Sequence, residues 1–86
     1  MKLILAVLPE KAATLASDRL VAQGYRVTRL ASTGGFLRRG NTTLLIGVED
    51  EHVETALRLL REARQQTRGD PSGIAIVLHV AGFERF

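Results

Sequence analysis

The 86-residue sequence contains no cysteine and no tryptophan. The lack of cysteine excludes disulfide bonds, thiolate metal sites and cysteine nucleophiles. No apolar run approaches the ~20 residues that a membrane-spanning helix needs. The N-terminal residues lack the long apolar core and small-residue cleavage site of a signal peptide. We therefore expect a cytoplasmic protein without a membrane partner.

Charge is in excess on the basic side, with 12 lysines and arginines against nine acidic residues. A net charge of +3 favours an anionic partner. We expect most of the arginines to lie on a solvated surface, except for the group around residues 26–39. The two histidines, His52 and His79, are too far apart in sequence for a metal-ligand pair on one helix face, so no metal site is expected.

Apolar periodicity divides residues 1–86, which are long enough for one domain, into four strands and two helices. Pro9 suits the first position of a helix and Asp50 suits an N-cap. The order is βαββαβ, an α+β ferredoxin-like pattern with a four-stranded antiparallel sheet and two helices on one face. The expected strands cover residues 2–8, 25–31, 42–48 and 74–80, and the expected helices cover residues 9–23 and 50–65.

The first and last strands are apolar on both of their faces, although two helices cover only one face of such a sheet. An exposed apolar sheet of this size would aggregate. We therefore expect another copy of the chain to cover the second face, in an obligate homo-oligomer.

The connection at residues 32–41 carries glycines, hydroxyl side chains and two arginines, with Phe36 and Leu37 between them. Glycine allows close backbone approach to a ligand, and free N–H groups with arginine side chains bind phosphate. An aromatic ring offers a face for a base. This composition predicts a nucleotide-binding loop.

Residues 33–43 (TGGFLRRGNTT) strongly resemble the signature of the PII-like cyclic di-AMP receptors. The resemblance runs without gaps from residue 1 to about residue 53 and includes residues 82–86 (GFERF). It implies a homotrimer with three clefts between subunits, each binding one cyclic di-AMP. Members of this family are not enzymes and need no cofactor. They sense a second messenger and change loop structure to alter contacts with a protein partner, which this sequence does not identify.

The resemblance also implies a set of ligand-binding positions. Arg26 and Thr28 would meet a phosphate or an adenine edge, and an arginine supplies the charge-assisted donor that a phosphodiester accepts. Asn41 would bind adenine, because its amide offers both a donor and an acceptor. Three loop positions would line the cleft, and a glycine on the third strand would let the ligand lie close to it: Gly35, Phe36, Leu37 and Gly47. Arg85 departs from the family pattern but could reach a phosphate, as tail arginines do in PII proteins.

Simpler roles stay open for three of these residues. Phe36 fits a local hydrophobic plug, Asn41 fits a turn and Gly47 fits a bulge. The chain also departs from the family pattern. The family commonly has a long insertion between the second helix and the last strand, where this chain has only residues 66–73. Ile76 stands where an aromatic is common, and Arg85 stands where a glutamine is common. Two alternatives therefore remain beside cyclic di-AMP: binding of ATP, ADP or another anionic nucleotide, or an interaction module that has lost its ligand.

Two other uses of this strand order are disfavoured. RNA-recognition domains stack bases on aromatic residues of the first and third strands, and neither strand has one here. An enzyme would need an acid or base in the cleft, but no carboxylate occurs between Asp18 and Glu49. We expect a non-enzymatic protein that does not bind nucleic acid.

Overall fold

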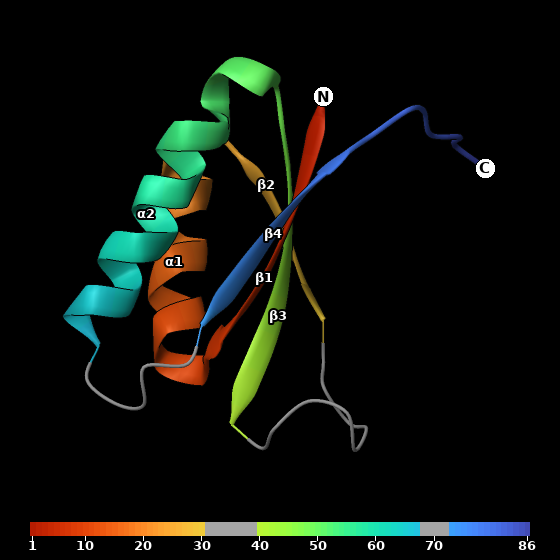
Figure 1. Cartoon of the computed structure of the whole chain (residues 1–86). Coiled ribbons are helices and arrows are strands. Elements are labelled where there is room, and N and C mark those ends of the chain that lie inside the picture. Colours follow the sequence, from red (N-terminus) through yellow and green to blue (C-terminus); the bar gives the residue numbers. More distant parts are fainter. Residues whose placement is uncertain (31–39, 68–72) are drawn as a thin grey trace.

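The computed structural model describes residues 1–30, 40–67 and 73–86. The four strands form one antiparallel sheet in the order β2-β3-β1-β4, and both helices cover the same face (Figure 1). This arrangement confirms the predicted ferredoxin-like fold. The elements in chain order are β1 (Lys2–Pro9), α1 (Glu10–Ala22), β2 (Arg26–Leu30), β3 (Asn41–Val48), the 3-10 helix η1 (Asp50–His52), α2 (Val53–Gln66) and β4 (Ile74–His79).

The core lies between the helices and one face of the two central strands. Ile4 pairs with Ile46 and Ala6 with Leu44, and all four side chains are fully buried. Small residues on α1 let that helix approach the sheet closely. The buried helix residues that complete this layer are Ala12, Ala13, Ala16, Leu20, Ala56, Leu59, Leu60 and Ala63.

The two predicted helix starts need correction. Pro9 is the last residue of β1 and the N-cap of α1, so the helix itself begins at Glu10. Asp50 does not cap α2, because a short 3-10 helix intervenes and its own N-cap, Glu49, makes no side-chain capping bond. Instead the Asp50 carboxylate lies 3.1 Å from the α-amino group of Met1.

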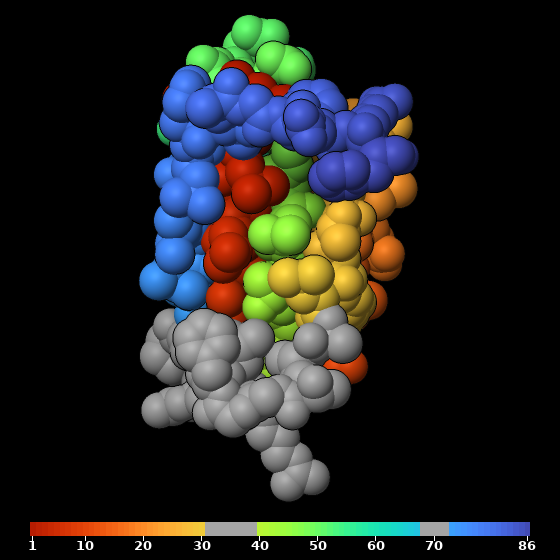
Figure 2. All heavy atoms as spheres, turned by 90° about the vertical axis from the view of Figure 1, so that its right-hand side faces the viewer, coloured from red at the N-terminus to blue at the C-terminus, as the bar shows by residue number. Residues whose placement is uncertain are grey.

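The second face of the sheet, hereafter the open face, is apolar and exposed in the single chain. Figure 2 looks onto this face, with the four strands side by side. On β4, Ile76 is 43% exposed and Leu78 is 45% exposed, and they pair with Leu5 and Leu3 of β1. Within the described residues, no helix is long and apolar enough to cross a membrane.

Candidate ligand-binding surface

Three predicted ligand-binding residues, Arg26, Thr28 and Gly47, lie together on the open face. Arg26 pairs with Gly47 across the β2–β3 ladder, and Thr28 is two residues further along β2 on the same face. The Arg26 side chain is exposed and makes no hydrogen bond or ion pair with any described residue. No described residue therefore occupies the donors of its guanidinium.

The neighbouring Arg29 has a different environment. It lies on the helix-covered side of β2, where its guanidinium donates to Thr14 Oγ1 at 3.1 Å. In the sequence, Arg26, Thr28 and Leu30 alternate with Tyr25, Val27 and Arg29, which predicts two faces for this strand. The structure confirms this division, with Arg29 bonded within the chain and Arg26 not bonded to any described residue. The pair provides a matched comparison for mutagenesis.

Gly47 is required neither by backbone conformation nor by packing within the chain. Its φ is not positive, the β1–β3 register runs unbroken through it, and it pairs with Arg26 as the terminal pair of the β2–β3 ladder, so it does not form a bulge. A Cβ here would meet only the flexible Met1 side chain, at 3.4 Å from Cε. The missing side chain leaves the sheet floor open directly beside Arg26.

A cavity of about 400 Å³ adjoins this floor and contains residues that the sequence alone did not reveal. Tyr25 and His52 form one wall, with their rings edge to face at 5.6 Å and the Tyr25 hydroxyl 3.2 Å from His52 Nδ1. Glu49 adds a carboxylate. Only the adjacency of Tyr25 to Arg26 gave a sequence signal, because His52 reaches the cavity through tertiary structure.

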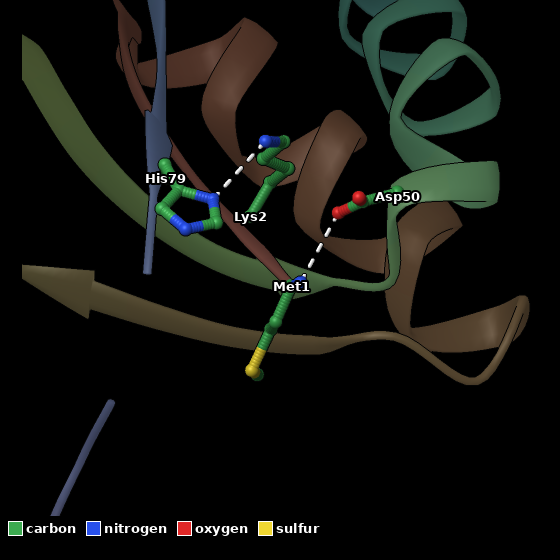
Figure 3. A network of polar contacts seen from close by, with 4 residues as sticks. All are labelled: Met1, Lys2, Asp50 and His79. Carbon is green, nitrogen blue, oxygen red and sulfur yellow. Dashed lines mark hydrogen bonds and ion pairs between the residues drawn. The ribbon is translucent and has the colours of Figure 1, made fainter. Parts of the chain in front are cut away.

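Met1 borders the same cavity and is held by polar contacts from two directions. Its α-amino group pairs with Asp50, and its carbonyl accepts a hydrogen bond from Val80 N–H at 3.1 Å. Figure 3 shows this ion pair beside the contact of Lys2 Nζ with His79 Nδ1, at 3.3 Å. Hydrogen bonding and charge attraction from the Met1 amine lower the pKa of Asp50.

Asn41 lies at the opposite end of β3 from Gly47. It is the first residue of the strand and pairs with Pro9, while the turn conformation falls on Gly40, whose φ is +89°. At a rise of roughly 3.3 Å per residue, Asn41 and Gly47 are about 20 Å apart. Gly35, Phe36 and Leu37, which belong to the same predicted group as Asn41, lie outside the described residues.

Arg85 lies in the segment that follows β4. Figures 1 and 2 show this segment leaving the upper end of β4 on the side of the open face, away from the helices. Arg85 is exposed, Phe83 is 72% exposed and Phe86 is fully exposed. Their side chains are therefore available to a neighbouring molecule.

Comparison with known proteins assigns the chain to a family. A family model described as cyclic-di-AMP receptor matches residues 1–82. The chain belongs to the cyclic-di-AMP receptor family. This membership indicates a binding and signalling role rather than catalysis.

One solved structure extends the likeness over nearly the whole chain. It is described as a functionally unknown protein from Pediococcus pentosaceus ATCC 25745, is 38% identical in sequence and has a TM-score of 0.79. The match covers 99% of this cyclic-di-AMP receptor family member and 96% of the other chain. It supports the fold and extends the similarity beyond the matched residues 1–82 to the C-terminal segment.

Proposed function

We propose that this protein is a cytoplasmic, non-enzymatic sensor that binds cyclic di-AMP in clefts between the subunits of a homotrimer. Binding reorders residues 32–41 and thereby changes the contact with a downstream protein partner. Family membership supports the ligand. The observation that carries the inter-subunit cleft is the distribution of the predicted contacts along β3.

Those contacts form two groups that one chain does not bring together. Arg26 and Gly47 pair near the C-terminal end of β3 and Thr28 pairs with Leu45 near its middle, whereas Asn41 is the first residue of the strand. The separation of about 20 Å follows from six residues at roughly 3.3 Å each. A second copy that applies its Arg26 end to the first copy's Asn41 end would complete a site from two half-sites.

The open face supports the same assembly. It carries aliphatic residues on all four strands, which are exposed on β2 and β4 and partly exposed on β1 and β3. A chain of this length is marginally stable alone and gains from burying such a surface. Packing of three open faces would supply that burial and would fix the relative position of the half-sites.

A second candidate ligand is ATP or ADP in the same clefts. Arg85 favours it, because this exposed arginine makes no ion pair with any described residue and suits a polyphosphate. Ile76 favours it as well, since an aliphatic side chain lacks the flat face that an aromatic offers to a second adenine. In this case, Arg85→Gln would weaken ATP binding while leaving the fold unchanged.

The primary test is isothermal titration calorimetry with cyclic di-AMP, in parallel with ATP, ADP and cyclic di-GMP at fixed salt. We expect binding of cyclic di-AMP in the micromolar range or tighter, at one ligand per subunit. Arg26→Ala should abolish it, and Arg29→Ala should not, because Arg29 faces the helices on the same strand. Tighter binding of ATP would support the second candidate. If none of the four nucleotides binds, the sensor hypothesis is rejected and a trimeric interaction module remains.

Mixed trimers test where the site lies. Asn41→Ala and Arg26→Ala chains should each fail to bind alone. In a mixture of the two, each mixed trimer contains one cleft with both residues intact, so binding should return in part. No recovery after confirmed subunit exchange would place the whole site within one chain and contradict the proposed cleft.

A further inference from the structure

A second cavity lies on the opposite side of the sheet from the open face, between α2 and β4. Its volume is about 280 Å³. Because it opens on the helix side of the sheet, it is separate from the surface that carries Arg26 and Gly47. Its floor is formed by β1 and β4 and one wall by Leu57 and Leu60 of α2.

The cavity exists because small residues meet where the sheet register would allow large ones. Ala6 of β1 pairs directly with Ala75 of β4, and Gly73 precedes that strand. A methyl group on Gly73 would lie 3.2 Å from Leu8 Cδ2, so the glycine lets the chain pass close to Leu8. The two alanines and the glycine leave a space that larger aliphatic residues would fill.

Incomplete cover by α2 keeps this space open to solvent. Ala75 and Val77 lie on the same face of the sheet as the fully buried Ala6 and Ile4, their partners on β1. Val77 is nevertheless 41% exposed. The helix therefore shields β1 but leaves β4 accessible along its edge.

Two arginines and a glutamine make the cavity wall polar in one part. Arg61 is exposed and forms no ion pair with any described residue, whereas Arg58 of the same helix lies 3.8 Å from Glu62. The stem of Arg64 passes over Gly73, with Cδ 3.7 Å from the position of a Cβ there. An apolar floor with an unpaired guanidinium at its edge suits an apolar molecule that carries one negative charge.

We propose that this cavity binds a small apolar carboxylate, with its hydrocarbon part against Leu57 and Ala75 and its carboxylate on Arg61. The volume is consistent with this ligand class, because a cavity of about 150 Å³ is enough for benzene. The remaining space accommodates a longer chain or a larger ring. The carboxylate of the ligand would neutralise the Arg61 guanidinium, which no described residue pairs with.

Calorimetric titration of the full chain with decanoate, below its micelle concentration, tests the proposal, with decanol as the neutral probe of matched length. Arg61→Gln should weaken decanoate binding about tenfold or more, the loss expected for a hydrogen bond to a charged group, and should leave decanol binding unchanged. Arg58→Gln is the matched control and should bind both probes as the wild type does.

Ala75→Leu tests the location of the hydrocarbon part. The added side chain should fill the cavity and abolish binding of both probes, and an exposed position on β4 tolerates the change. Val77→Leu, two residues away on the same face and outside the cavity lining, should bind normally. Decanoate binding that survives Ala75→Leu, or no decanoate binding to the wild type, would overturn the proposal. Retained cyclic di-AMP binding in Ala75→Leu would show that loss of the helix-side cavity does not affect the proposed nucleotide site.

Discussion

Truncation of Leu78 on the open face gives the most direct test of self-association. Full burial of a leucine side chain contributes about 1.5–3 kcal/mol. Leu78 is 45% exposed in the single chain, so its cover by another copy should contribute about 1 kcal/mol per subunit. For three subunits, Leu78→Ala should weaken assembly by about 3 kcal/mol, or roughly a hundredfold in the association constant.

Sedimentation and urea unfolding at several protein concentrations would measure this effect. The wild-type midpoint should rise with protein concentration, and the rise should begin at higher concentration for Leu78→Ala. Val21→Ala is the control, because Val21 is 58% exposed on the outer surface of α1. A concentration-independent midpoint in the wild type, with equal effects of the two substitutions, would refute the reasoning.

Three further substitutions and one control test the fold itself. Ile46→Ala should lower the unfolding free energy by about 2–5 kcal/mol in urea titration, because it leaves a cavity at a fully buried site. Gly40→Ala should destabilise by about 1–2 kcal/mol through strain at φ +89°, since nothing lies within 4 Å of its Cβ. Gly82→Ala, equally unobstructed and without a positive φ, should have no effect. Asp50→Asn should remove a stabilisation that is present above the ordinary carboxyl pKa of 3.8 and lost as the pH falls below it, because the Met1 amine lowers the folded-state pKa. Thermal unfolding at acidic and neutral pH would measure that difference.

Local sequence patterns were sufficient to predict the order of strands and helices along the chain and the two faces of β2. Alternation in that strand assigned Arg26 and Thr28 to one side and Arg29 to the other, and the register confirms this division. A period of two residues along a half-exposed strand is a local property that needs no knowledge of distant contacts.

Features that depend on distant contacts were not predictable in this way. Aspartate is a residue type favoured at helix N-caps. The Asp50 carboxylate instead lies 3.1 Å from the Met1 amine, which the sheet brings beside it. His52 likewise meets Tyr25 only after α2 has packed on the sheet. The Ala6–Ala75 pairing that opens the second cavity is a matter of register between the first and last strands.

The proposed stability of the assembly and its proposed binding site depend on the same geometric fact. Across residues 1–30, 40–67 and 73–86, the two α-helices bury only one face of the sheet. The other face therefore carries both exposed aliphatic residues and the polar residues Arg26 and Thr28, which we propose bind the ligand. In the proposed trimer, burial of the aliphatic residues would bring Arg26 and Thr28 of one chain toward Asn41 of another. Residues such as Leu78 are therefore expected to affect nucleotide binding without touching the nucleotide, and the loss of binding should follow the loss of assembly.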